Sequence, residues 1–154
     1  FGKAQAAAGI SLPTKGTVFI TVTDRDKPAA TQLAARFHDL GFHVIATRGT
    51  AQAISRMGVP VTAINKIGDG SPHVVDFIRN GEVDLVINTP TGSGARSDGY
   101  EIRTASVRRG IPCITTMTGA SAAARAIFAQ RERRTEPRSL QELHDTDSRQ
   151  RARV

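Results

Sequence analysis

The sequence predicts an α/β fold of the three-layer, Rossmann-like kind, with a parallel sheet of about five strands flanked by helices. Short apolar, β-branched runs alternate along the chain with segments whose apolar residues recur at helical spacing. The runs are apolar throughout, which is typical of strands buried on both faces. Strands that alternate with helices through short connections form a parallel sheet covered by helices. The 154 residues suffice for one domain with its own core.

Five segments have the composition of strands. The clearest is VDLVI, and TVFITV is the next. In chain order the predicted strands are residues 17–22, 43–46, 61–64, 83–87 and 112–116. We expect the first and the fourth of these strands to be buried on both faces, because both are apolar on successive residues.

The segments between the strands predict helices with recognisable ends. The first has Asp24 or Asp26 as a cap, Pro28 in its first turn, and Gly41 after its last apolar residue. The later helices are predicted over residues 47–57, 72–80, 100–109 and 119–130. Residues 88–99 (NTPTGSGARSDG) are predicted as a long, glycine-rich polar loop.

The composition divides the chain into three parts. Residues 16–130 are expected to form the folded domain, and residues 10–16 (ISLPTKG) to form a linker. Because the chain opens with Phe1 and without Met, residues 1–15 are expected to be a remnant of a preceding domain plus this linker. Residues 131–154 form a polar tail, in which residues 139–144 suit a short helix and the far end is expected to be disordered.

The composition also limits the classes of function. Cys113 is the single cysteine, so no intramolecular disulfide can form; this fits a cytoplasmic location, and we interpret Cys113 as a small buried apolar residue. No apolar run approaches the length of a membrane span. The net charge of +7 (21 Lys and Arg against 14 Asp and Glu) favours a phosphate-bearing partner, either a nucleic acid or a small nucleotide. With one Tyr and no Trp for base stacking, nucleic acid is the less favoured of the two.

In a parallel α/β sheet, ligands bind beyond the carboxyl ends of the strands. The segments that follow the predicted strands are rich in hydroxyls, amides, lysines and glycine. They are residues 23–27, 47–50, 65–66, 88–93 and 115–118. Because the ends of parallel strands share one edge of the sheet, we expect these segments to form a common rim.

Thr47-Arg48-Gly49-Thr50 lies where a strand passes into a helix, so its backbone amides and hydroxyls could bind an anion. Lys27 and Lys66 would bring positive charge to the same rim. These groups predict a phosphomonoester site, although the four residues could also be a plain helix cap. Asn88 and Thr89 could contact a base or ribose, or could fix the following loop. We find no metal-ligand spacing and no nucleophile motif, and therefore predict no catalytic or metal-binding residue.

Four segments together resemble a known family. They are TVTDRDK (21–27), ATRGTA (46–51), INKIGDGSPHVVDFIRNGEVDLVINTPTG (64–92) and DGYEIRTASVRRGIPCITT (98–116). The family is the carboxy-terminal allosteric domain of the large chain of carbamoyl phosphate synthetase, which has a methylglyoxal-synthase-like fold. The resemblance covers roughly residues 16–128, and the opening FGKAQ resembles the end of the ATP-grasp half that precedes this domain.

The resemblance implies an effector site for nucleoside monophosphates: UMP, an inhibitor, and in some members IMP. Its phosphate-binding positions fall on Lys27, Thr47, Gly49, Thr50 and Lys66. Its base and ribose positions fall on Asn88, Thr89, Thr91 and Gly92. A threonine that helps to hold ornithine, at the contact with the rest of the large chain, falls on Thr115. Pro90 departs from the family pattern, which has a hydroxyl residue there, so IMP binding is in doubt.

For the parent chain the resemblance implies synthesis of carbamoyl phosphate from bicarbonate, glutamine-derived ammonia and two ATP, for arginine and pyrimidine synthesis. ATP with Mg or Mn would serve the parent, and this domain would hold no cofactor of its own. Its partners would be the rest of the large chain and the glutaminase small chain, and an oligomer is left open. The domain itself would be regulatory and non-catalytic.

Two other functions are alternatives to a regulatory domain. Methylglyoxal synthase, a phosphate lyase of the same fold, uses an aspartate and a histidine whose positions here are Ser71 and Ser97. Neither serine can act as a carboxylate base or an imidazole acid, so this alternative is disfavoured. A basic nucleic-acid-binding module is the second alternative, which the net charge allows.

Overall fold

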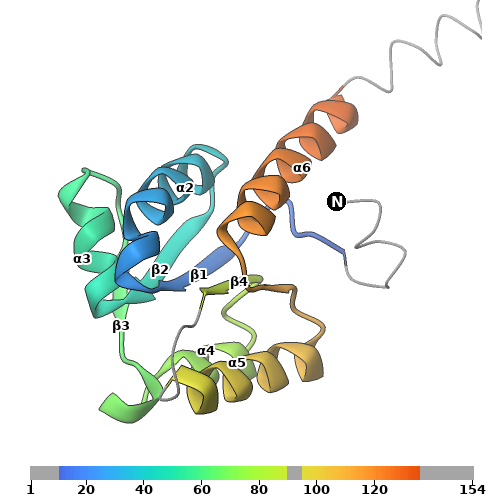
Figure 1. The fold of residues 1–154 in the computed structure, drawn as a ribbon. Helices are drawn as coiled ribbons and strands as arrows, with labels where there is room; N and C mark the ends of the chain where they lie inside the picture. Colours follow the sequence, from blue (N-terminus) through green and yellow to red (C-terminus); the bar gives the residue numbers. More distant parts are fainter. Residues whose placement is uncertain (1–10, 90–94, 136–154) are drawn as a thin grey trace, which may run out of the picture.

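The computed structural model describes residues 11–89 and 95–135, with the backbone alone for 95–97 and 135. Five parallel strands form one sheet in the order β3-β2-β1-β4-β5 (Figure 1). The strands are β1 (Thr17–Val22), β2 (His43–Thr47), β3 (Thr62–Ile64), β4 (Leu85–Thr89) and β5 (Cys113–Ile114). The helices are α2 (Lys27–Asp39), α3 (Arg48–Arg56), α4 (Val74–Arg79), α5 (Ala95–Arg109) and α6 (Met117–Thr135), with 3-10 turns η1 (Asp24–Asp26) and η2 (Ile67–Asp69).

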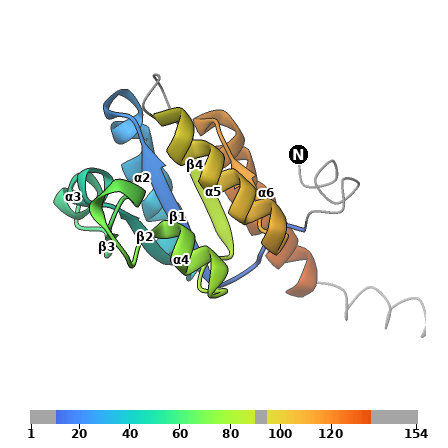
Figure 2. The ribbon, with the colours of Figure 1, turned by 90° about the horizontal axis from the view of Figure 1, so that it is seen from below.

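Helices cover both faces of the sheet, as Figures 1 and 2 show: α2, α3 and α6 on one face, α4 and α5 on the other. Each face has its own apolar core, and β1 contributes to both. Val18 and Ile20 pack with α2 and α6, whereas Phe19 packs with α4 and α5. Burial on both faces is the reason why this run is apolar on successive residues. The predicted three-layer fold is confirmed.

The topology places a crevice between β1 and β4. From β1 the chain runs outward through β2 to β3 and then returns to the other side of β1 for β4 and β5. The strand order therefore reverses between β1 and β4, which are neighbours in the sheet. In open α/β sheets ligands bind at such a switch point, outside the carboxyl ends of the strands.

The fourth strand and the helix after it differ from the prediction. β4 runs through Thr89, because Thr21 pairs with Asn88 and Val22 with Thr89 in the register with β1. Helix α5 begins at Ala95, although residues up to 99 were predicted as loop. An acidic residue, Asp98, suits the first turn of a helix, and a glycine inside a helix costs only about 1 kcal/mol. Asn88 and Thr89 are thus strand residues rather than loop residues.

The edges of the domain also extend further than predicted. Helix α6 covers residues 117–135 rather than 119–130, and the Arg131 guanidinium donates a hydrogen bond to the Leu40 carbonyl at the end of α2. In the segment predicted as a linker, Leu12 is buried and belongs to the core under α2 and α6. Strand β5 is shorter than its predicted range of 112–116. None of the described helices is long and apolar enough to cross a membrane.

Cys113 in β5 packs against the core under α4 and α5. Burial raises the pKa of its thiol to about 11, from an ordinary value near 9. The folded protein therefore holds this proton more tightly than the unfolded chain does. The resulting stability is present below about pH 9 and is lost as the pH rises toward 11.

We expect the Cys113 thiol to react slowly with iodoacetamide at about pH 8, because the thiolate is the nucleophile and burial suppresses it. Unfolding the protein in urea should accelerate the alkylation at least tenfold. Mass spectrometry of timed samples measures both rates. Equal rates in native and unfolded protein would contradict the burial of this thiol.

Candidate functional site

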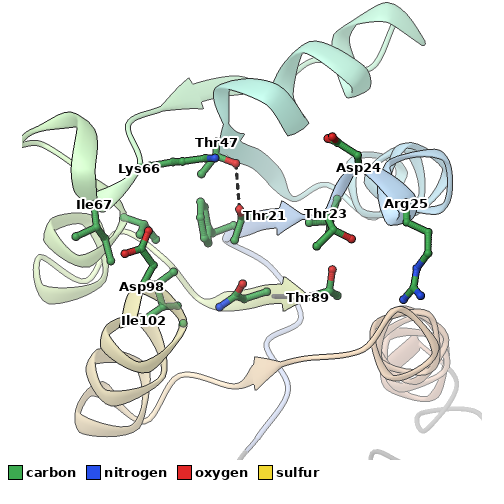
Figure 3. A pocket seen from close by; sticks show the side chains of 15 residues that line it. Thr21, Thr23, Asp24, Arg25, Thr47, Lys66, Ile67, Thr89, Asp98 and Ile102 are labelled. Carbon is green, nitrogen blue, oxygen red and sulfur yellow. Dashed lines mark hydrogen bonds between the residues drawn. The ribbon is translucent and has the colours of Figure 1, made fainter. Parts of the chain in front are cut away.

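A cavity of about 860 Å³ opens at the carboxyl ends of the strands, above the switch point (Figure 3). Polar side chains from β1, β2, β4 and the η2 segment converge on it. They include Thr21, Thr23, Thr47, Lys66, Asn88 and Thr89. The apolar side chains of Phe19, Ile67, Val74 and Ile102 line it as well. An apolar wall combined with a few converging polar groups is the usual character of a small-molecule site.

Three threonine hydroxyls join β1 to the junction of β2 and α3. The Oγ1 atoms of Thr21 and Thr47 are 3.0 Å apart, and the Thr47 hydroxyl donates to Thr50 Oγ1 at 3.5 Å. Thr50 Oγ1 also accepts from the Val22 backbone amide at 3.4 Å. Thr47 lines the cavity, whereas Thr50, only 2% exposed, supports it from behind. Both residues were predicted to bind phosphate. In the structure Thr47 lines the cavity, and Thr50 is hydrogen-bonded to Thr47 behind it.

The amino terminus of α3 has the features of an anion site. Its N-cap residue, Thr47, makes no side-chain hydrogen bond to the backbone amides of the first turn, and that turn holds no acidic residue. The unpaired amides and the helix dipole therefore favour a negative charge here. Lys27 brings positive charge to the same helix end. Its Nζ lies so close to Gly49 that a Cβ built on this glycine would be 3.3 Å away. A cation this close to a helix amino terminus is best compensated by an anion that binds to both.

Asp24 supplies a carboxylate near this point. Its Oδ1 lies 2.6 Å from Lys27 Nζ, and its side chain is otherwise exposed to solvent. The hydrogen bond and charge of Lys27 hold the pKa of Asp24 below its ordinary value, and the charge of Lys66 acts in the same direction. Lys27 and Lys66 thus act on one small region, and both were predicted to bind phosphate. A phosphate there would have to compete with the Asp24 carboxylate for Lys27.

We expect Asp24→Asn to tighten binding of inorganic phosphate by about two- to fivefold, because an exposed carboxylate competes weakly for a lysine and also repels an anion. Titration calorimetry at low salt measures this change. Asp39→Asn, which removes an exposed carboxylate at the other end of α2, is the matched control and should change nothing. Unchanged or weaker phosphate binding in Asp24→Asn would place the anion away from Lys27.

The side of the cavity formed by β4 differs in character. Asn88 is 5% exposed, and its Nδ2 has no hydrogen-bond partner among the residues that the structure describes. The Thr89 hydroxyl donates to Asp26 Oδ2 at 2.9 Å. An unpaired buried donor beside a cavity indicates a ligand acceptor, since leaving such a group unsatisfied costs about 1–3 kcal/mol. Asn88 and Thr89 were expected either to contact a ligand or to fix the following loop. The unpaired amide of Asn88 favours ligand contact, whereas the hydroxyl of Thr89 is bonded to Asp26.

Other predicted residues lie elsewhere. Asn65 accepts a hydrogen bond from Arg48 at 3.0 Å and donates to the Gly70 carbonyl at 3.4 Å, so it fixes its own loop. Thr115 is exposed directly after β5 and does not line the cavity. Thr91 and Gly92, together with Pro90, lie outside the described residues.

Of the two positions of the lyase alternative, Ser71 helps to hold a helix start. The Ser71 hydroxyl donates to Asp76 Oδ2 at 2.7 Å, and the same oxygen accepts from the His73 amide at 2.8 Å, which holds the start of α4. The side chain of Ser97 lies outside the described part of the structure. Within the described residues, no cluster of His, Cys, Asp and Glu could hold a metal ion.

Thr23, which lay in the predicted rim segment 23–27, does line the cavity, whereas the sequence did not single out Thr21 or Asp98, which line it too. Thr21 is next to the last residue of a predicted strand, so the rule about strand ends could have found it. Asp98 lay at the end of a predicted loop, and only the earlier start of α5 brings it to the cavity.

Comparison with known proteins agrees with the fold. The family model described as the MGS-like domain matches residues 29–115, more than half of the chain. The chain therefore belongs to the MGS-like domain family. A solved structure of methylglyoxal synthase from Elizabethkingia anophelis superposes with a TM-score of 0.57 and 22% sequence identity, over 75% of this chain and 78% of that one. This likeness shows the fold.

Within that family, the chain is similar to carbamoyl phosphate synthase large chains, which confirms the resemblance predicted from its motifs. It is 50% identical over 145 residues to the large chain of Gemmatimonas aurantiaca, which covers 94% of this chain and 13% of that protein. It is 46% identical over 148 residues to the C-terminal section of the large chain of Methanopyrus kandleri, which covers 96% of this chain and 27% of that section. The chain thus spans about an eighth of a whole large chain.

Proposed function

We propose that this domain binds a nucleoside monophosphate at the carboxyl ends of its strands and regulates a carbamoyl phosphate synthase without catalysing a reaction itself. The anion site at the amino terminus of α3 carries this proposal. There, the first-turn amides have no side-chain cap, Lys27 Nζ would lie 3.3 Å from a Cβ built on Gly49, and the charge of Lys66 acts on the same region. These groups suit one phosphate, and the helix amino terminus favours it further.

The remainder of the cavity suits a nucleoside. Its volume of about 860 Å³ lies within the usual range for small-molecule sites, and the apolar wall of Phe19, Val74 and Ile102 could pack against a base. Asn88 Nδ2 would donate to an acceptor on the ligand. Pyrimidine and purine bases both present such acceptors, so UMP and IMP are both candidates, with Thr91 and Gly92 as further contacts.

The parent protein would be a carbamoyl phosphate synthase that uses ATP with Mg or Mn, is joined by a glutaminase small chain, and works in the cytoplasm. Ornithine would bind near Thr115, where this domain meets the rest of the large chain. An effector can regulate only if it binds two states of the whole protein unequally. The similarity to large chains over 94% of this chain supports the assignment.

We expect the isolated domain to bind UMP weakly to moderately and to form no methylglyoxal. Side-by-side titration calorimetry with UMP, IMP and ornithine measures the binding. Incubation with dihydroxyacetone phosphate, followed by assays for phosphate and methylglyoxal, tests for the lyase. Appreciable methylglyoxal would refute the regulatory proposal, and steeply salt-dependent binding to an oligonucleotide with no binding of UMP would favour the nucleic-acid alternative.

A further inference from the structure

We propose that Asp26 is a positioning residue that fixes two threonine hydroxyls as hydrogen-bond acceptors, so that the cavity selects a ligand with hydroxyl donors, such as the ribose of a ribonucleotide. The proposal deepens the proposed function and rests on it. It concerns the side of the cavity between the ends of β1 and β4, whereas the anion site lies at the amino terminus of α3.

The carboxylate of Asp26 reaches both strand ends. Its Oδ2 accepts the hydroxyl hydrogen of Thr89 at 2.9 Å and that of Thr23 at 3.4 Å. Its Oδ1 lies 3.6 Å from Arg25 Nε, and the Asp26 side chain is 18% exposed. Asp26 is the N-cap residue of α2, where an aspartate usually caps the first-turn amides, yet it makes no side-chain bond to them. Its carboxylate is therefore used to hold the two threonines.

These bonds determine what the threonines offer to a ligand. A hydroxyl has one hydrogen to donate and two lone pairs that accept. Because Thr23 and Thr89 donate their hydrogens to Asp26, each presents only lone pairs to the cavity that both line (Figure 3). A ligand group that bonds to either threonine must therefore be a hydrogen-bond donor.

The opposite side of the cavity has the reverse polarity. Lys66 and the backbone amides at the amino terminus of α3 are donors, and they suit a phosphate. The cavity as a whole thus fits a phosphomonoester whose hydroxyl groups lie a few ångströms from its phosphate. A ribonucleotide has this arrangement, and a deoxynucleotide lacks one of the donors. A ligand with a second phosphate on the sugar would place an acceptor against acceptors.

Asp26→Ala tests the proposal, because it removes the oxygen that accepts both threonine hydroxyls and so frees their hydrogens to point into the cavity. We expect the unaltered domain to bind UMP about five- to tenfold more tightly than 2′-deoxy-UMP or 3′-deoxy-UMP, within the range for one neutral hydrogen bond. In Asp26→Ala this ratio should fall toward one. The ratio of UMP to uridine affinity, which reports on the phosphate, should keep at least its original value, since the lost negative charge lies near Lys27.

Comparison of affinity ratios separates positioning from a structural effect. Loss of structure would weaken UMP and both deoxynucleotides alike, and an unchanged preference for the ribonucleotide in Asp26→Ala overturns the proposal. Asp24→Ala, the matched control, removes a neighbouring carboxylate that contacts Lys27 and should keep the preference. If Asp26→Ala does not fold, Thr89→Ser should keep the preference and Thr89→Val should lose it; equal preferences in both overturn the proposal as well.

The outcomes also separate this inference from the proposed function. Binding of UMP and both deoxynucleotides with equal affinity to the unaltered domain would refute the role of Asp26 and leave the nucleotide site standing. Absence of binding of any of the four ligands would refute both.

Discussion

Lys66→Ala is expected to weaken UMP binding by roughly ten- to a hundredfold and to leave uridine binding nearly unchanged. Lys66 lines the cavity from the start of η2, and its side chain lies alongside Thr47 (Figure 3). A charge-assisted hydrogen bond contributes about 1.5–3 kcal/mol, and each 1.4 kcal/mol changes an affinity tenfold. The effect should be confined to ligands that carry the phosphate, which titration calorimetry of UMP and uridine would show directly.

The chain offers a matched control for this change. Lys15→Ala removes another exposed lysine, which precedes β1 at the opposite edge of the sheet, and should leave UMP binding unaltered. Thr50→Val should cost less than Lys66→Ala, because its hydroxyl is neutral and supports Thr47 rather than lining the cavity. If Lys66→Ala keeps its fold and its full affinity for UMP, Lys66 is a solvated lysine and the phosphate binds elsewhere.

The elements that the sequence predicted well are those whose burial produces a pattern within a short run of residues. The run 17–22 is apolar because each residue faces one of the two cores, and this leaves a pattern that can be read without the structure. The end of β4 leaves no such pattern. Asn88 and Thr89 are polar, and they are strand residues only because they pair with Thr21 and Val22, more than sixty positions earlier.

The same distinction applies to the site. A rule about parallel sheets is enough to bring Thr47, Lys66 and Asn88 to one edge, because each directly follows or ends a strand. The contact between Asp26 and Thr89 spans 63 positions and depends on the side-chain orientation of an N-cap residue. The sequence suggested a helix cap for Asp26, which is the usual role of such a residue, and nothing local distinguishes the two roles.

Asn88→Leu is expected to make the unliganded domain more stable and to weaken UMP binding at the same time. Asn88 is 5% exposed and its Nδ2 is unpaired among the described residues, so the unliganded fold bears the cost of a desolvated donor. Removing an unsatisfied buried polar group recovers about 1–3 kcal/mol in the free energy of unfolding. The melting temperature should therefore rise by about 2–8 °C. UMP, which would supply the missing acceptor, should bind about tenfold or more weakly.

Asn65→Leu is the contrasting variant, because the amide of Asn65 is bonded both to Arg48 and to the Gly70 carbonyl. The same chemical change there removes two hydrogen bonds and should bring no rise in melting temperature. Calorimetric melting curves of the three proteins, each with and without UMP, measure both effects. A protein whose site is built for a ligand gives up stability in the empty state, so opposite signs for stability and affinity at Asn88 identify it as a binding residue. A fall in melting temperature together with unchanged UMP affinity would instead assign Asn88 to the structure of the sheet edge.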